Sequence, residues 1–213
     1  MMSTRASKPP AVRAILFDAD GVIQRTRGNW REQFCTMLGR EEHLETFIAE
    51  LFAAEKPCLT GHADFENQVA TVLDRWRASA TVNDALSIWT NIEVDAEIID
   101  TISAVRRSGI ACYLASNQQA HRARYMAHAL GYRAKFDRAF YSCHVGYAKP
   151  DRAYFDHVLA ELGLAPDDVL FIDDLEPNVA SAREAGIRGV HFKANAGVAA
   201  LVQHLSEHGI RLA

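Results

Sequence analysis

Two aspartates, two residues apart, follow an apolar run near the start of the chain. The run spans Ala14 to Phe17, and Asp18, Asp20 and Gly21 come after it. Because alternate residues of a strand share a face, both carboxylates are expected to point into one crevice. Two close carboxylates raise each other's pKa unless a cation is present, and a hard divalent ion such as Mg²⁺ prefers oxygen ligands of this kind. The alternative is a plain β-turn, in which Asp20 and Gly21 supply only turn geometry.

Two further polar clusters follow apolar runs later in the chain. Ser116 and Asn117 end one run, and Asp173 and Asp174 end another. If each run is a buried parallel strand, these residues lie at one edge of the sheet together with the first pair. The Ser116 hydroxyl then either caps the helix that follows it or, with the exposed N–H groups of that helix, binds a phosphate.

Lys149 precedes Pro150, and this lysine is the positive counterpart of the acidic clusters. Pro150 suits the first turn of a helix and forces Lys149 to be extended, so the ammonium projects from a rigid point at the sheet edge. Four carboxylates face this single lysine, and one divalent cation brings the site close to neutral. A phosphate dianion can enter only such a neutralised site. The charge balance therefore favours a metal-dependent phosphoryl-transfer site.

Two kinds of hydrophobic pattern indicate the elements that carry these clusters. Between 30 and 91 apolar residues recur at steps of three and four, which predicts a bundle of amphipathic helices. After this segment apolar runs alternate with helical segments, which predicts a doubly wound parallel sheet. We therefore expect an α/β fold with a Rossmann-like sheet and a small inserted α-helical cap domain. The core domain would span 11–23 and 95–213, and the cap domain 24–94.

The expected elements have definite bounds. The strands after the insertion are predicted at 111–115, 139–141, 169–172 and 189–192. Helices are predicted at 98–108, 121–130, 150–162 and 178–185, with one more at the C-terminus. Inside the insertion, 57–61 is predicted to be a loop.

The order of the motifs resembles the haloacid dehalogenase-like (HAD) superfamily, in particular its phosphatases with a helical cap inserted just after the first strand. The resemblance runs from Arg13 to Phe192. Its motifs are Asp18-Ala19-Asp20-Gly21-Val22, Ser116-Asn117, Lys149-Pro150 and Phe171-Ile172-Asp173-Asp174-Leu175-Glu176-Pro177-Asn178.

This resemblance implies a role for each catalytic residue. Asp18 attacks phosphorus and becomes an aspartyl phosphate, while Asp20 protonates the leaving oxygen and then activates water. Ser116, with Asn117 beside it, binds the transferring phosphoryl group. Lys149 pairs with that group and with Asp18.

The resemblance also implies a Mg²⁺ cofactor. Its ligands would be the Asp18 carboxylate, the Asp20 backbone carbonyl and an acid of the last motif. The four-residue step to Asn178 makes Asp174 the expected direct ligand, while Asp173 either ligates the ion or holds a bound water. Many relatives have an acid in place of Asn178, which here can hydrogen bond the lysine but cannot neutralise it. The retained Asp20 argues against the dehalogenase branch, which lacks this acid and needs no metal.

We expect a Mg²⁺-dependent phosphatase that hydrolyses a small phosphorylated metabolite, either a sugar phosphate or a nucleotide-like monoester. A phosphomutase of the same family, in which the cap excludes water and the phosphoryl group returns to a substrate hydroxyl, is an alternative that the sequence leaves open. A signalling module resembling a receiver domain also accepts phosphate on an aspartate. In that family the acidic pair comes first and the acceptor later, whereas here the order is reversed and a helical bundle interrupts the chain.

Selection of the substrate is expected to lie in the cap. Candidate substrate contacts are Arg25, Arg27 and Arg31, with Arg25 the first choice. A set of aromatic residues could form a substrate box, although their helical spacing favours a place in the core. These are Trp30, Phe34, Phe52 and Trp76.

Composition argues against several classes of partner. A net charge of −4 over 213 residues and the lack of a basic run give no footprint for nucleic acid. The four cysteines form no C-x-x-C pair, which favours reduced thiols, and the i, i+4 pair His204 and His208 lacks further ligands nearby. No segment has the apolar length of a signal peptide or a membrane span. We expect a soluble cytoplasmic monomer or weak homodimer with no membrane partner and a disordered segment 1–10.

Overall fold

The structure, a computed structural model, describes residues 11–212, so the expectation of a disordered first segment falls outside the described residues. Within this range five parallel strands form one sheet in the order β5-β4-β1-β6-β7. The predicted doubly wound parallel sheet is confirmed. Its strands are β1 (Ala14–Phe17), β4 (Ala111–Ser116), β5 (Arg138–Tyr141), β6 (Val169–Asp173) and β7 (Arg188–His191).

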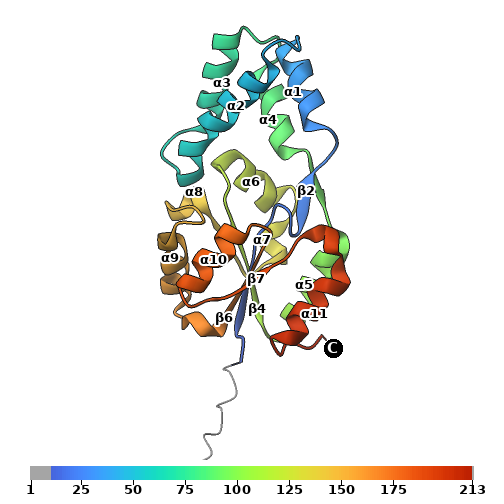
Figure 1. Ribbon diagram of the computed structural model, residues 1–213, viewed down its shortest axis with the longest axis vertical. Coiled ribbons are helices and arrows are strands. Elements are labelled where there is room, and N and C mark those ends of the chain that lie inside the picture. The colour runs from blue at the N-terminus through green and yellow to red at the C-terminus, as the bar shows by residue number, and fades with distance from the viewer. Residues whose placement is uncertain (1–10, 213) are drawn as a thin grey trace, which may run out of the picture.

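Helices cover both faces of the sheet and form a further layer beyond one end of it (Figure 1). Those around the sheet are α5 (Ala96–Arg107), α6 (Ala120–His128), α7 (Tyr132–Lys135), α8 (Ser142–Val145), α9 (Arg152–Leu162), α10 (Glu176–Glu184) and α11 (Val198–Glu207), with the 3-10 helices η2 (Pro166–Asp168) and η3 (Ala194–Ala196). The helical insertion consists of α1 (Trp30–Leu38), α2 (Leu44–Glu55), the 3-10 helix η1 (Lys56–Thr60), α3 (Phe65–Trp76) and α4 (Val82–Thr90).

Strand β1 lies at the centre of the sheet because both of its faces are apolar. Ile15 and Phe17 belong to the buried cluster under α5 and α11, whereas Ala14 and Leu16 belong to the cluster under α9 and α10. A strand without polar alternation is stable only where helices cover both sides of the sheet. The strand therefore brings its last residues to the middle of the carboxyl edge.

The helical insertion packs around a core of its own. Its buried side chains include Phe34, Phe47 and Val69, and this cluster shares no residue with the two clusters of the sheet. Two short strands, β2 (Gln24–Thr26) and β3 (Ile92–Val94), pair antiparallel where the chain enters and leaves the insertion. The sequence pattern contained no sign of this pair, because three residues are too few to show alternation.

Two local predictions are wrong. Segment 57–61 is not a plain loop, because the 3-10 helix η1 occupies most of it. Pro150 is not in the first turn of a helix: α9 begins two residues later, and the Asp151 carboxylate caps it by accepting a hydrogen bond from the backbone N–H of Ala153 at 2.9 Å. Pro150 instead follows Lys149 through a cis peptide bond.

The helices of the described range are all too short or too polar to cross a lipid bilayer. The four cysteines are Cys35, Cys58, Cys112 and Cys143, and each is a free thiol.

Candidate active site

The backbone turns sharply just beyond β1, where the two motif aspartates lie. The N–H of Asp18 donates to the carbonyl of Ile172 at 2.9 Å, which extends the pairing of β1 with β6 by one residue. Gly21 then adopts a φ of 78°, a left-handed conformation that glycine enters without strain. A Cβ at this position would clash with the Asp174 carboxylate. The turn therefore requires glycine, both for its conformation and for the space beside Asp174.

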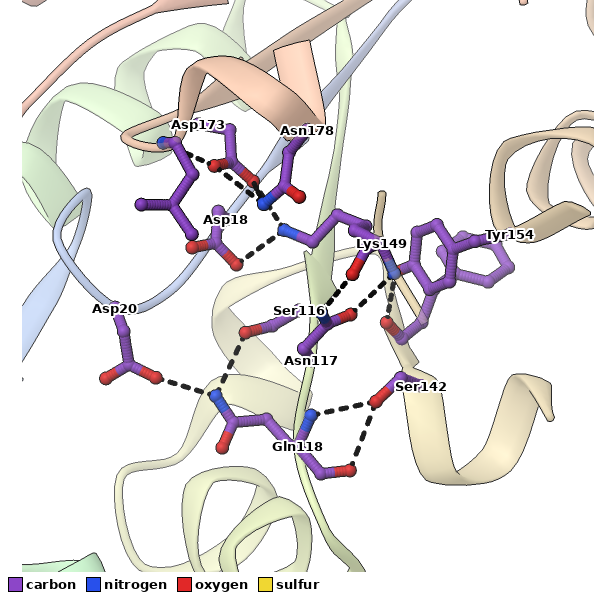
Figure 2. A network of polar contacts seen from close by, with 12 residues as sticks. Asp18, Asp20, Ser116, Asn117, Gln118, Ser142, Lys149, Tyr154, Asp173 and Asn178 are labelled. Carbon is purple, nitrogen blue, oxygen red and sulfur yellow. Dashed lines mark hydrogen bonds and ion pairs between the residues drawn. The ribbon is translucent and has the colours of Figure 1, made fainter. Parts of the chain in front are cut away.

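The ammonium group of Lys149 lies between two buried carboxylates (Figure 2). Its Nζ is 2.8 Å from Asp18 Oδ1 and 2.5 Å from Asp173 Oδ2. Burial alone would lower the pKa of Lys149, but the two carboxylates outweigh that effect and raise it. Burial raises the pKa of Asp18 to about 7, although the ammonium opposes the rise. One lysine thus does not compensate fully for the burial of the Asp18 carboxylate.

Asn117 holds the backbone of Lys149 in place. Its amide Nδ2 donates to the Lys149 carbonyl at 2.7 Å, and its Oδ1 accepts from the Lys149 N–H at 2.9 Å. The resemblance implied that Ser116, with Asn117 beside it, binds the phosphoryl group, yet both polar atoms of the Asn117 amide are engaged with this backbone. Ser116 differs, because its Oγ accepts a hydrogen bond from Gln118 and keeps its own O–H free to donate.

The two acids at the end of β6 have different surroundings. Asp173 accepts from Lys149, from the N–H of Leu175 at 2.8 Å and from Asn178 Nδ2 at 3.0 and 3.1 Å. Asn178 was predicted to bond the lysine, but it bonds Asp173 instead. The Asp174 carboxylate accepts no hydrogen bond from another of the described residues. Burial, reinforced by the charge of Asp173, raises its pKa.

Three acids form a cluster that suits a divalent cation. Asp18, Asp173 and Asp174 each offer one carboxylate oxygen, and these oxygens lie within 4.8 Å of one another. Hard oxygen donors of this kind are the ligands that Mg²⁺ takes in proteins. The free carboxylate of Asp174 and the space left by Gly21 beside it fit direct ligation. Asp173 already bonds Lys149 and Asn178, so it suits a role in positioning these neighbours better than a role as a direct metal ligand.

Asp20 has a separate set of partners. The Arg122 guanidinium binds its carboxylate with two nitrogens, each at 2.7 Å, in the bidentate geometry that arginine favours. Gln118 Nε2 donates to the same carboxylate at 2.7 Å, and Gln24 Nε2 does so at 3.1 Å. Figure 2 shows Gln118 bridging Asp20 and Ser116. The two motif aspartates are therefore held by different cations.

Gln118 and Arg122 were missing from the sequence candidates. Gln118 comes directly after Ser116-Asn117 and precedes α6, whereas Arg122 lies four residues later in the first turn of that helix, and its guanidinium donates to Gln118 Oε1 at 3.2 Å. That spacing was the available signal. Arg122 also reaches the helical insertion, because its Nε donates to the carbonyl of Trp89 in α4 at 2.8 Å.

Arg25 lies away from this cluster. Its guanidinium pairs with Glu93 across the β2–β3 ribbon at 2.9 Å, and its side chain is 70% exposed. Arg31 pairs with Glu45 on α2 at 2.8 Å. A substrate contact from Arg25, Arg27 or Arg31 stays a prediction, and the structure does not bring Arg25 or Arg31 to the carboxylates.

A cavity of about 270 Å³ opens between the helical insertion and the edge of the sheet. Trp30, Phe34 and Phe52 line it, together with Trp89, which was not among the sequence candidates. Trp76 instead packs against Phe47 at 5.7 Å and donates its N–H to Glu50. From the sheet side the lining residues are Asn117, Gln118 and Arg122.

Comparison with known proteins agrees with this architecture. The family model for a haloacid dehalogenase-like hydrolase matches residues 12–186. The solved HAD family enzyme of Bacteroides thetaiotaomicron in complex with magnesium and inorganic phosphate has a TM-score of 0.77 and 21% sequence identity, and the match covers 90% of this chain and 99% of that one. At this identity the likeness shows the fold.

Curated proteins match over shorter stretches. A drimenol cyclase of Aspergillus calidoustus is 49% identical over 57 residues, 27% of this chain and 11% of its own length. A sesquiterpene phosphatase of Aspergillus oryzae is 30% identical over 101 residues, 46% of this chain and 50% of its own. A chloroplast flavin mononucleotide hydrolase of Arabidopsis thaliana is 41% identical over 73 residues, 34% of this chain and 29% of its own. The chain spans at most half the length of these relatives. On the match to most of its length, this chain belongs to the haloacid dehalogenase-like hydrolase family.

Proposed function

We propose that this protein is a Mg²⁺-dependent phosphatase that hydrolyses the monoester of a small phosphorylated metabolite through an aspartyl phosphate. One observation carries the proposal: two aspartates two residues apart have different cationic partners, Asp18 with Lys149 and Asp20 with Arg122. A nucleophile and a general acid need such different surroundings. The names of two relatives, a sesquiterpene phosphatase and a flavin mononucleotide hydrolase, support the same reaction class.

In the first step an oxygen of Asp18 attacks phosphorus and the bond to the leaving oxygen breaks, while Asp20 gives that oxygen a proton. Lys149 lies against Asp18 and can accompany the negative charge onto the phosphoryl group. The Ser116 hydroxyl is free to donate to a phosphoryl oxygen. In the second step Asp20 takes a proton from water, whose oxygen attacks phosphorus, so that phosphate leaves and the Asp18 carboxylate is restored.

Mg²⁺ fits the cluster of Asp18, Asp173 and Asp174, and when bound it would neutralise charge on the phosphoryl oxygens and on the carboxylates. The related Bacteroides enzyme forms a complex with magnesium and inorganic phosphate together, which supports this assignment. We infer direct ligation by Asp18 and Asp174, with the Asp20 carbonyl as a further ligand. Arg122 supplies a second fixed cation in the site, so one divalent ion brings the four carboxylates close to neutrality.

We also propose that residues 24–94 act as a cap that selects the substrate and excludes water, while the catalytic residues belong to the sheet. The separate core of the helical insertion supports this division. The cytoplasmic location, the monomer or weak homodimer and the absence of nucleic-acid and membrane partners stay predictions.

The proposal is tested by measuring phosphate release from p-nitrophenyl phosphate and from a panel of phosphorylated metabolites. Turnover should vanish in chelator and return with Mg²⁺. Asp20→Asn should slow release of phosphate from the metabolite esters by about a hundredfold, which is the usual scale for loss of a general acid. Asp167→Asn, at an exposed aspartate of the sheet part, serves as the matched control and should leave the rate unchanged. Full activity in chelator would contradict the metal assignment, and transfer of phosphate without its release would favour a mutase.

A further inference from the structure

The cavity lies on the side of the site that receives the leaving group. Gln118 and Arg122 line the cavity, and both donate to the Asp20 carboxylate. Because Asp20 is assigned to protonate the leaving oxygen, the organic part of the substrate must extend from Asp20 toward these two residues. The cavity between cap and sheet is therefore the place where the alcohol part of the ester resides.

Aromatic rings form the cap wall of this cavity. The ring centroid of Phe34 lies 5.8 Å from that of Trp30 and 5.5 Å from that of Trp89. The centroids of Phe52 and Trp89 are 6.1 Å apart, and each pair has edge-to-face geometry. Trp30 is 41% exposed and Phe52 is 42% exposed. Rings of this size, gathered at the mouth of a concave site, indicate a surface that an apolar ligand covers.

Three polar side chains of the wall are already engaged, and Thr26 on β2 adds one hydroxyl. Asn117 uses both polar atoms of its amide on the Lys149 backbone. Gln118 donates to Asp20 and accepts from Arg122, and Arg122 in turn bonds Asp20 and a backbone carbonyl of α4. A site built for the hydroxyls of a sugar would offer unpaired donors and acceptors instead. Asn117, Gln118 and Arg122 therefore shape the cavity more than they offer hydrogen bonds to a substrate.

Glu55 is the remaining charged side chain of the wall. Burial raises its pKa to about 7, although a hydrogen bond from the Trp89 side chain opposes the rise. Near neutral pH a large share of Glu55 is therefore uncharged, and the wall does not repel an apolar group. The size of the space is also informative: 270 Å³ is nearly twice the roughly 150 Å³ that accommodates benzene in a protein core.

We infer that the substrate is the phosphate monoester of an apolar alcohol of roughly ten carbon atoms, whose hydrocarbon part packs against Trp30, Phe34 and Phe52. This inference rests on the proposed phosphatase function and names the substrate class of that same site. It names a different class from the sugar phosphate or nucleotide-like monoester expected from the sequence.

A series of esters tests the inference. The rate constant kcat/KM is measured for ethyl, hexyl and decyl phosphate below their micellar concentrations, and for glucose 6-phosphate as a polar ester of intermediate size. Because transfer of each methylene into an apolar site is favourable, kcat/KM should rise along the alkyl series by about a hundredfold or more. Glucose 6-phosphate should fall at or below the level of ethyl phosphate.

Variants of the wall connect the preference to the cavity. Phe52→Ala and Trp30→Ala change half-exposed rings, so the fold should tolerate both. Each should lower the ratio of kcat/KM for decyl to that for ethyl phosphate by about tenfold. Val202→Ala truncates an exposed apolar side chain on α11, outside the cavity, and should leave the ratio unchanged.

The outcomes separate the two proposals. If ethyl phosphate is hydrolysed but kcat/KM does not rise with chain length, or if glucose 6-phosphate is preferred, the inference fails and the phosphatase function stands. An unchanged ratio in both wall variants would overturn the assignment of the hydrocarbon to this cavity. If none of the esters is hydrolysed in the presence of Mg²⁺, the proposed function fails and this inference fails with it.

Discussion

The edge of the sheet and the cavity beneath the cap are held together in different ways. At the sheet edge Asp18, Lys149 and Asp173 are buried and bonded to one another through short contacts. Around the cavity the rings of Trp30 and Phe52 are half-exposed and touch their neighbours by their edges. The first arrangement fixes each group through polar contacts, whereas the second leaves part of each ring exposed. The contrast fits the proposed division, in which the sheet performs the reaction and the cap selects the alcohol.

Arg122 joins the two regions. Its guanidinium binds Asp20 with two nitrogens, while its Nε donates to the backbone of the cap at Trp89. The position of Asp20, the proposed general acid, is thus connected to the position of α4. Substitutions at the sheet edge, at this junction and in the cavity should accordingly have effects of decreasing size.

The largest effect is expected for Asp18→Asn. An amide is a poor nucleophile, so turnover should fall by about 10⁴-fold or more, and no covalent phosphoenzyme should be seen by mass spectrometry of acid-quenched protein. Asp168→Asn, at the opposite end of β6, is the control and should retain normal turnover and form the covalent phosphoenzyme. A normal rate in Asp18→Asn would require a nucleophile elsewhere and would end the comparison between the two regions.

The next effect is on stability. Lys149→Met leaves Asp18 and Asp173 facing each other without a cation, which should cost about 3–5 kcal/mol in the free energy of unfolding of the metal-free protein. Arg152→Met removes one side of an exposed pair with Asp156 at 3.3 Å and should cost less than about 1 kcal/mol. Urea unfolding measures both. Equal losses would show that the buried pair at the sheet edge has no special importance.

Replacement of the junction residue sharpens the comparison. Arg122→Lys loses the bidentate geometry, so Asp20 is held less well and hydrolysis of alkyl esters should slow by about tenfold. The rate with p-nitrophenyl phosphate should fall less, because its leaving oxygen needs no proton. Arg138→Lys, in an exposed pair with Glu161, is the control. An equal loss on alkyl and aryl esters would show that Arg122 does not act through the general acid.

The smallest effect concerns the cavity wall and pH. Burial raises the pKa of Glu55 to about 7 in the folded protein. At a pH between the ordinary pKa of a glutamate and this value, unfolded chains have lost the Glu55 proton while the folded protein keeps it. Stability of the wild type should therefore fall as pH rises through this window. Glu55→Gln removes that dependence and should gain on the order of 1 kcal/mol relative to wild type between pH 5 and pH 8.

Glu50 on the same helix provides the control for this measurement. Hydrogen bonds from Trp76 and Arg75 lower the pKa of Glu50, so its contribution is present above the ordinary pKa and is lost as pH falls. Glu50→Gln should accordingly lose stability relative to wild type as pH rises, opposite in sign to Glu55→Gln. The same sign in both variants would contradict the pKa of Glu55.

Local pattern was enough to locate the sheet and to predict that the acids and the lysine meet at its edge. An unbroken apolar run such as Ala14 to Phe17 can be buried only between two layers of helices, and polar residues after parallel strands must share one edge. The spacing of Asp18 and Asp20, with acids and a lysine later in the chain, therefore predicted the reaction class from the sequence alone. The helical period of 30–91 likewise predicted the inserted helices.

The sequence pattern does not show which side chains from distant segments contact one another. Arg122 binds Asp20 although the two are 102 residues apart in the sequence. The Asn117 amide likewise bonds the backbone of Lys149, 32 residues away. The cavity is lined by side chains of the helical insertion and of the sheet edge, so its shape exists only when these two parts of the fold lie together. Helical spacing favoured a buried place for Trp30 and Phe52 because periodicity reports which face is apolar. Only the tertiary structure decides whether another helix or an open space lies opposite that face.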